Sequence, residues 1–163
     1  MRALPTLLLA FGASLLPSCR CFPLRCEYKI SFQIAADQAI NDGATLRIDV
    51  VPIRKDEIPE FAKITADEWF LSSSRRRTRF LRERRIGFFV IEAGDGSWRP
   101  GGASPPYPAW KPDRDFQAVA VFANFAAPHK DPERKRLLFS DAELYQRSWQ
   151  ARVVVHDTFL SKG

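Results

Sequence analysis

Short apolar runs of strand length recur along this chain, and they constrain its fold more than any other feature. In residues 28–34 every second residue is apolar, as in a strand with one buried face. Residues 116–125 (FQAVAVFANF) are the most strand-like run, small and apolar enough for the centre of a sheet. The other runs are residues 45–53, 86–93, 137–139 and 149–155. Six or more such strands, with one helical insertion after the second, predict an all-β fold, an antiparallel β-sandwich.

The connection between the first two runs, residues 37–44 (DQAINDGA), is rich in turn-forming residues. Asn41, Asp42 and Gly43 accept left-handed backbone conformations at low cost. A connection of this length predicts that the first two strands are antiparallel neighbours. Pro52 places the end of the second strand at a sheet edge or a bulge.

A helix start follows the second strand at residues 65–68 (TADE). This is a capping-box pattern, in which Thr65 and Glu68 each accept a hydrogen bond from the other's amide. We expect a helix from about residue 66, in two pieces because residues 72–74 are serines, ending before Ile86. Trp69 and Phe70 lie in its first turn, so both rings need cover, and we expect them to pack the helix onto the sandwich.

The first nineteen residues have the features of a cleaved leader that ends at a lipid-bearing cysteine. Residues 4–16 are an apolar run that follows Arg2, and Leu-Pro-Ser-Cys closes it at Cys19. A helix needs roughly 20 apolar residues to span a membrane, so this run is too short and fits a secretory segment. We expect a signal peptide at 1–18, an acylated (palmitate-bearing) Cys19, a tether at 19–27 and the sandwich at 28–163. Ordinary secretion and a cytosolic protein are the alternatives.

Two more cysteines, Cys21 and Cys26, follow closely. Residues 22–25 (FPLR) place proline where a turn favours it, so an oxidising compartment would permit a small disulfide here. Free thiols are the alternative. A metal pair would need further ligands, and the two histidines, His129 and His156, are far along the chain. No metal is therefore expected.

Seven arginines lie within the eleven residues from Arg75 to Arg85. One interpretation is a solvated helix whose arginine stems cover apolar surface. The other is a contact with anionic headgroups, cell-wall polymer or an acidic partner. The net charge is +6, yet interleaved aromatics are scarce and export is expected, so nucleic-acid binding is not expected.

Residues 94–115 form a long proline- and glycine-rich stretch that carries Trp98, Tyr107 and Trp110. These rings could stack on a sugar, grip a partner or cap the end of the sandwich. A Ser-His-Asp triad can be written with His156 and Asp157, but no nucleophile-elbow sequence accompanies a serine. We expect no catalytic residues, no cofactor and no small-molecule substrate.

Three short segments, in this order, resemble one family. They are residues 46–51 (LRIDVV), Glu68-Trp69-Phe70 before a basic helix, and residues 121–125 (VFANF). A cysteine that is expected to be acylated also precedes the first strand. In this order, the chain resembles the outer-membrane lipoprotein of type VI secretion systems, the TssJ/SciN/VasD group. The insert at 94–115 and the arginine density are not features of that group.

The resemblance implies a transthyretin-like β-sandwich with an added helix and a structural, non-enzymatic role. The family member is tethered to the outer membrane at its periplasmic face and holds the periplasmic domain of an inner-membrane protein, TssM. Arg20, rather than aspartate, after Cys19 agrees with outer-membrane sorting. Family binding is associated with the first inter-strand loop, which implies Ala39, Ile40, Asn41, Asp42 and Gly43 here. The alternative is an envelope lipoprotein that binds glycan or an anionic surface through residues 94–115 and the basic helix.

Overall fold

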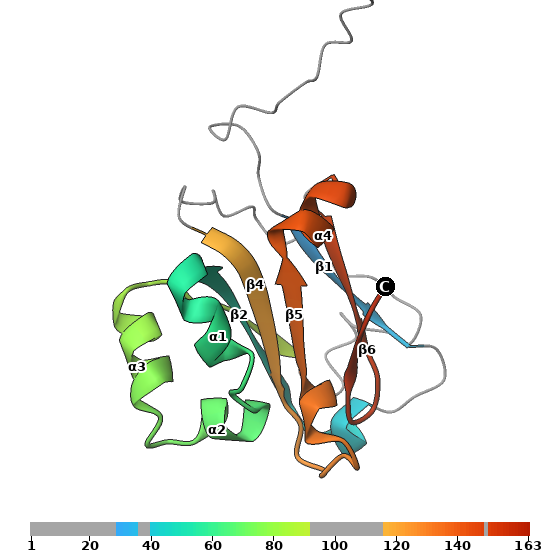
Figure 1. The fold of residues 1–163 in the computed structure, drawn as a ribbon. Helices are drawn as coiled ribbons and strands as arrows, with labels where there is room; N and C mark the ends of the chain where they lie inside the picture. The colour runs from blue at the N-terminus through green and yellow to red at the C-terminus, as the bar shows by residue number, and fades with distance from the viewer. Residues whose placement is uncertain (1–28, 36–39, 92–115, 149) are drawn as a thin grey trace, which may run out of the picture.

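The protein, seen in a computed structural model, is described at residues 29–35, 40–91, 116–148 and 150–163. Two sheets and a group of helices form three layers in these ranges (Figure 1). The strands are β1 (Lys29–Ile34), β2 (Leu46–Arg54), β3 (Gly87–Ile91), β4 (Phe116–Asn124), β5 (Arg136–Ser140), β6 (Gln150–Val155) and β7 (Leu160–Lys162). One sheet has the order β1-β6-β7 and the other β3-β2-β4-β5.

The α-helices are α1 (Ile58–Phe61), α2 (Ala66–Phe70), α3 (Arg75–Arg82) and α4 (Asp141–Gln146), with 3-10 helices η1 (Ile40–Gly43), η2 (Lys55–Glu57) and η3 (Pro132–Lys135). The first three α-helices lie on the outer face of the four-stranded sheet (Figure 1). The predicted capping box is confirmed, because the Glu68 amide donates to the Thr65 hydroxyl (3.2 Å) and the Thr65 amide to the Glu68 carboxylate (2.9 Å). The predicted helix in two pieces corresponds to α2 and α3.

The strands β2 and β4 are buried on both faces, which explains their nearly continuous apolar sequences. On β4, Val119 and Val121 face the three-stranded sheet, whereas Ala120 and Phe122 face the helices. The central position predicted for residues 116–125 is confirmed, since β4 pairs with both β2 and β5. The sandwich therefore holds one core between its sheets and a second core under α1–α3.

The predicted pairing of the first two strands is wrong. β1 pairs in parallel with β6, Lys29 opposite Gln150, and β2 lies in the other sheet. A period-two pattern specifies which face of a strand is buried but leaves its partner open. The β-sandwich itself is confirmed, with this one parallel pair among antiparallel ones in the described ranges.

Several short elements were not predicted from the sequence, among them α4 and β7. The start of α4 does carry a local signal, because Ser140 and Glu143 form a second capping box. The strand β7 has three residues and is held by its pairing with β6, so its own sequence is too short to indicate it.

Candidate partner-binding site

Several of the predicted site residues lie outside the described residues. These are Cys19, Cys21, Cys26, Ala39 and the aromatic residues of segment 94–115. The lipidation site and the disulfide therefore stay predictions. The described part of the predicted partner loop is η1, Ile40–Gly43.

η1 lies at one end of the sandwich, the loop end, where β4 and β6 finish and β2 begins. The Asn41 amide donates to the carbonyl of Asp157, just after β6 (3.0 Å). β1 begins at the opposite end, the Lys29 end, where Lys29 pairs with Gln150 at the start of β6. Figure 1 shows the cyan η1 near the bottom and the blue start of β1 near the top. The segment that carries Cys19 thus joins the domain at the end opposite to η1.

Asn41 holds this loop in place from inside. Its side chain donates to the carbonyls of Ala44 (3.3 Å) and Thr45 (3.0 Å) and accepts from the Ala126 amide, just after β4 (2.6 Å). The residue is 1% exposed. Asn41 therefore positions the loop, and its side chain is not on the surface that a partner would meet. The left-handed prediction is confirmed, with φ of 52° at Asn41 and Asp42 and 77° at Gly43.

Among the described residues of the loop, Asp42, Gly43 and Ala44 are exposed. The Asp42 amide donates to the carboxylate of Asp157 (3.4 Å), which ties the loop to the β6–β7 turn. Ile40 is partly buried and packs against the core between the sheets, so it turns inward rather than toward solvent. The result is a small exposed surface whose backbone is held by the hydrogen bonds of the buried Asn41 side chain.

A buried clamp fastens the helices to the sheet. The Asp49 carboxylate on β2 accepts hydrogen bonds from Trp69 Nε1 on α2 (3.0 Å) and Arg77 Nε on α3 (2.8 Å), and also from Arg47 (3.1 Å). Asp49 and Trp69 are fully buried, and the Trp69 ring stacks on Phe122 with centroids 4.7 Å apart. The packing role predicted for Trp69 agrees with this geometry. Sequence reasoning missed Asp49, although a carboxylate within an apolar strand signals that a cationic or N–H partner is needed.

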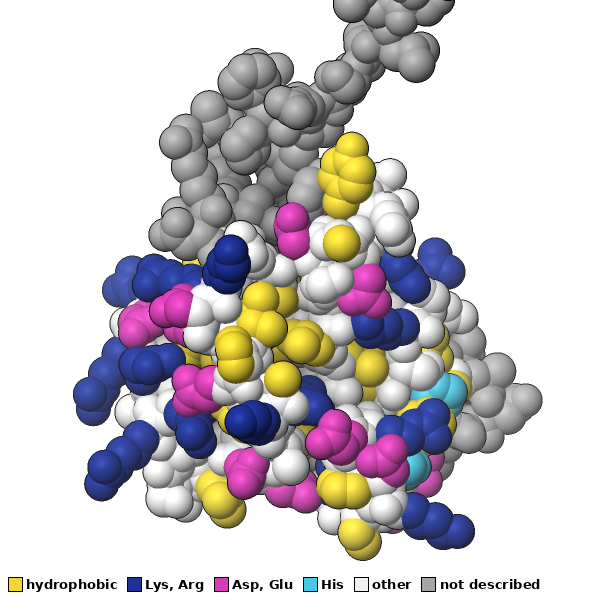
Figure 2. Space-filling model, viewed as in Figure 1, with side chains coloured by type: hydrophobic (Ala, Val, Ile, Leu, Met, Phe, Trp, Pro, Cys, Tyr) yellow, Lys and Arg dark blue, Asp and Glu magenta, His cyan; other side chains and the backbone are white. Residues whose placement is uncertain are grey.

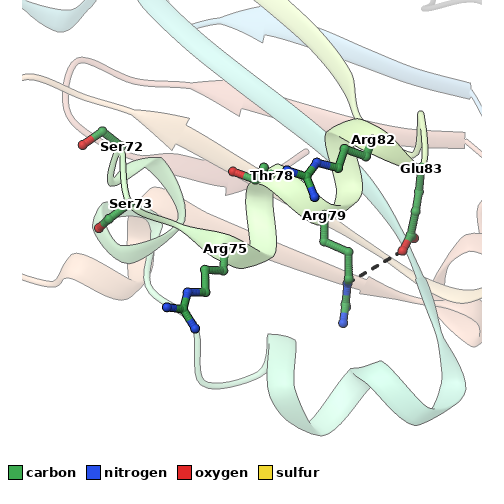
Figure 3. A pocket seen from close by; sticks show the side chains of 7 residues that line it. All are labelled: Ser72, Ser73, Arg75, Thr78, Arg79, Arg82 and Glu83. Atoms are coloured by element: carbon green, nitrogen blue, oxygen red, sulfur yellow. Dashed lines mark ion pairs between the residues drawn. The ribbon is translucent and has the colours of Figure 1, made fainter.

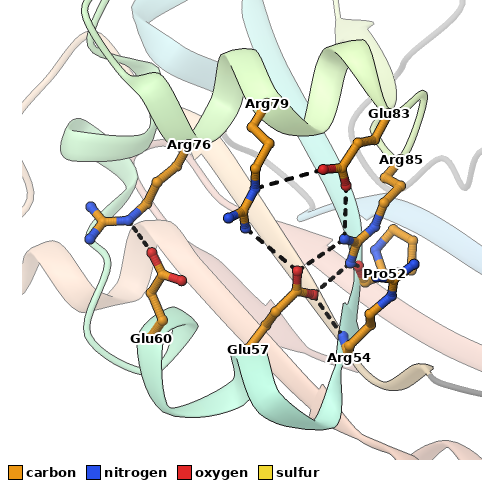
Figure 4. Close-up of polar contacts among 8 residues, drawn as sticks. All are labelled: Pro52, Arg54, Glu57, Glu60, Arg76, Arg79, Glu83 and Arg85. Carbon is orange, nitrogen blue, oxygen red and sulfur yellow. Dashed lines mark hydrogen bonds and ion pairs between the residues drawn. The ribbon is translucent and has the colours of Figure 1, made fainter.

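Glu57 is the centre of a second polar network, between η2 and α3 (Figure 4). Arg85 makes two contacts to it, at 2.6 and 3.0 Å, and the Arg54 amide donates to it at 2.9 Å. Burial acts to raise the pKa of Glu57, but these hydrogen bonds outweigh it and hold the pKa below its usual value. Arg76 pairs separately with Glu60. Part of the arginine run therefore forms ion pairs within the protein. The interpretation of the run as a solvated helix did not separate these arginines from the exposed ones.

His156 and Ser161 are brought together across the β6–β7 turn, with His156 Nε2 and Ser161 Oγ 2.9 Å apart. The His156 ring stacks on Phe159, and burial together with the charge of Arg134 lowers its pKa. The carboxylate of Asp157 meanwhile bonds the Asp42 amide. These contacts place His156, Asp157 and Ser161 in the β6–β7 turn, which supports the loop end.

No cluster of His, Cys, Asp or Glu that could hold a metal ion occurs among the described residues. Among the helices in those same ranges, none is long and apolar enough to cross a membrane.

Comparison with solved structures reveals the same fold in components of one secretion machine. A chain of a structure described as "Type VI membrane complex" matches with a TM-score of 0.57 and 16% identity, over 84% of this chain and 98% of that one. The T6SS lipoprotein TssJ1 of Pseudomonas aeruginosa matches with a TM-score of 0.53 and 11% identity, over 84% and 95%. This chain has the fold of a type VI secretion lipoprotein. The fold implied by the sequence resemblance is confirmed.

A third match, from EAEC, belongs to a structure described as "T6SS protein TssM C-terminal domain". It has a TM-score of 0.54 and 15% identity, over 83% of this chain and 96% of that one. No protein-family model matches the sequence, and no curated protein matches it. The likeness is therefore one of fold over almost the whole of each matched chain, at low sequence identity.

Proposed function

We propose that this protein is an envelope lipoprotein of a type VI secretion membrane complex. It is acylated at Cys19, held at the periplasmic face of the outer membrane, and binds the periplasmic domain of a TssM-like inner-membrane protein. Its role is structural, without a catalytic step. The observation that carries the proposal is the fold, which is shared with a T6SS lipoprotein over 84% of the chain.

The two ends of the sandwich support this assignment. The Cys19 segment joins the domain at the Lys29 end, and η1 lies at the opposite end. A protein anchored at the Lys29 end would present the loop end away from its membrane, toward a partner held in the other membrane. The rigid support of η1 by Asn41 would limit the ordering cost of binding.

Replacing Cys19 with serine is expected to abolish acylation and to move the protein from the membrane fraction to the soluble fraction. The physical reason is that the acyl chains supply the anchor, and two or more chains are needed for stable attachment. Metabolic labelling with palmitate, followed by membrane fractionation, checks this result. Cys21→Ser and Cys26→Ser serve as controls and should keep the label. Label that persists in Cys19→Ser, or that depends on Cys21 or Cys26, would contradict the assignment.

Replacing Ala44 with arginine is expected to weaken capture of the partner's periplasmic domain about ten- to a hundredfold, a loss of about 1.4–2.8 kcal/mol. Ala44 is exposed beside η1, so arginine adds bulk and charge at the proposed contact without moving Asn41. The measurement is the Kd for the TssM-like periplasmic domain by biolayer interferometry.

Ala62→Arg is the matched control, because Ala62 is also exposed but lies after α1 on the helical layer. It should leave the Kd unchanged, and both variants should melt near the wild-type temperature. If Ala62→Arg weakens capture while Ala44→Arg does not, the loop end is not the contact.

A further inference from the structure

α3 carries an exposed face rich in arginine, and Figure 2 shows Lys and Arg side chains gathered on the side of the molecule where α3 lies. Arg75, Thr78, Arg79 and Arg82 follow the spacing i, i+3, i+4, i+7, which places them on one side of a helix. The opposite side buries Phe80. We call these four exposed residues the α3 stripe; Arg79 also pairs with Glu57 (3.5 Å), whereas Arg75 and Arg82 have no ion pair in the described ranges.

The α3 stripe lines a shallow open hollow of about 450 Å³, together with Ser72, Ser73 and Glu83. Figure 3 shows the serines at one end of the hollow and Glu83 at the other, with the arginine side chains between them. Glu83 is engaged by Arg85 (3.1 Å) and more distantly by Arg79 (3.9 Å). The hollow therefore combines positive charge with hydroxyl donors, which suits a phosphate-bearing ligand.

The arginines of this region divide into two groups. Arg76, Arg77 and Arg85 pair with Glu60, Asp49 and Glu57, respectively, and Arg79 pairs with Glu57 (3.5 Å) and Glu83 (3.9 Å). Arg75, Arg82 and Arg84 are exposed and make no ion pair with any residue in the described ranges. Internal pairing thus explains the first group only, and the second group remains available to an external anion.

Arg84 occupies a backbone position that does not suit it. Its φ is 53°, and its amide donates to the Leu81 carbonyl (3.1 Å) while the Arg85 amide donates to that of Phe80 (3.0 Å). This is a Schellman motif, in which the left-handed residue is usually glycine. An arginine here adds positive charge at a conformational cost, which points to a role outside folding.

The C-terminal end of α3 lies toward the Lys29 end of the sandwich. Arg85, just beyond it, donates to the Pro52 carbonyl (2.9 Å), and its guanidinium lies 5.1 Å from the centre of the Phe116 ring at the start of β4. Leu81, 41% exposed, lies beside Arg82 on this part of the helix. Positive charge and an exposed apolar side chain therefore occur together near the end that joins the Cys19 segment.

We propose that the α3 stripe and Arg84 bind the phosphate groups of anionic phospholipids in the membrane that holds the protein. Guanidinium groups bind phosphate oxygens in a bidentate manner, and an exposed leucine can enter the boundary between headgroups and acyl chains. The choice of lipid rests on the proposed function, because acylation at Cys19 would keep the Lys29 end beside a membrane. The arginines would then orient the anchored domain on its membrane and leave the loop end free.

Vesicle co-sedimentation of the full chain carrying Cys19→Ser tests this proposal, because that chain has no acyl group. The vesicles contain phosphatidylcholine alone or with about 30% phosphatidylglycerol. The added pair Arg75→Gln/Arg82→Gln should lower the partition coefficient for the anionic vesicles about tenfold or more. Salt at about 0.5 M should lower it as well. The added pair Lys63→Gln/Lys130→Gln removes the same charge from exposed sites elsewhere and should leave binding nearly unchanged.

Arg84→Gly separates lipid binding from folding. Glycine suits the left-handed position, so this variant should melt at or above the wild-type temperature while it binds anionic vesicles less tightly. Equal losses in the arginine and lysine pairs, or equally tight binding to phosphatidylcholine alone, would overturn the proposal.

Capture of the TssM-like periplasmic domain is measured on the same variants and should be unchanged. If the arginine pair loses capture, the α3 stripe is a protein contact and the lipid assignment is wrong. If the wild type captures no partner, the proposed function fails, while the vesicle results still decide the role of the α3 stripe.

Discussion

Replacing Asp49 with alanine is expected to lower the free energy of unfolding by about 3–5 kcal/mol. The substitution leaves Arg77, whose side chain is 18% exposed, without the carboxylate that compensates its charge. It also removes the acceptor of the buried Trp69 N–H group. An uncompensated buried charge costs more than the ion pair itself contributes, which is why the expected effect is large. Urea unfolding at equilibrium, monitored by tryptophan fluorescence and circular dichroism, measures the change.

Asp56→Ala is the matched control for Asp49→Ala. Asp56 is an exposed carboxylate on η2, so its removal should change stability by less than about 0.5 kcal/mol. The double variant Asp49→Leu/Arg77→Met should be more stable than Asp49→Ala, because it removes the charge together with its partner. A single variant Asp49→Ala as stable as Asp56→Ala would show that the clamp does not hold the helices to the sheet.

Replacing Trp69 with alanine is expected to cost about 3–5 kcal/mol as well. The ring is fully buried, stacks on Phe122 and contacts Phe61 and Phe80 at centroid distances of 5.8 and 6.0 Å. Its loss leaves a cavity between α2 and the four-stranded sheet and removes one of the hydrogen bonds to Asp49, whose carboxylate keeps Arg77 and Arg47. Thermal melting and urea unfolding should both report the loss.

Trp69→Phe and Leu71→Ala serve as controls for this prediction. Trp69→Phe keeps most of the apolar contact but removes the N–H donor, so it should cost less than Trp69→Ala. Leu71 directly follows α2 and is 58% exposed, so Leu71→Ala should be within about 0.5 kcal/mol of wild type. A Trp69→Ala protein with unchanged melting that no longer captures its partner would refute the packing role and make Trp69 a binding residue.

The local features of this fold could be predicted from the sequence because neighbouring residues determine them. The capping box at Thr65 needs only a side chain three residues away, and Asn41 and Asp42 accept the left-handed region by themselves. The run at 116–125 indicates a central strand because both of its alternating faces are apolar. These predictions did not depend on where the rest of the chain lies.

The sites depended more on contacts between distant segments. The sequence predicted that residues 39–43 form a contact loop, but Asn41 is buried and accepts a hydrogen bond from the amide of Ala126, eighty-five residues away. Similarly, the arginine run gives no indication of which members face Asp49 or Glu57. The division into paired and unpaired arginines requires the positions of β2 and η2 beneath α3.

The all-β class, the helical insertion with its start at Thr65 and the turn at Asn41-Asp42 could each be predicted from the amino-acid sequence. These follow from periodicity and from side-chain–backbone bonds that close within a few residues. Three features became visible in the folded protein alone: β1 pairs in parallel with β6, Asp49 joins α2 and α3 to the sheet, and η1 lies opposite to the Lys29 end. The physical reason is that apolar alternation specifies a buried face alone, whereas strand partners and ion pairs are selected when distant segments pack together.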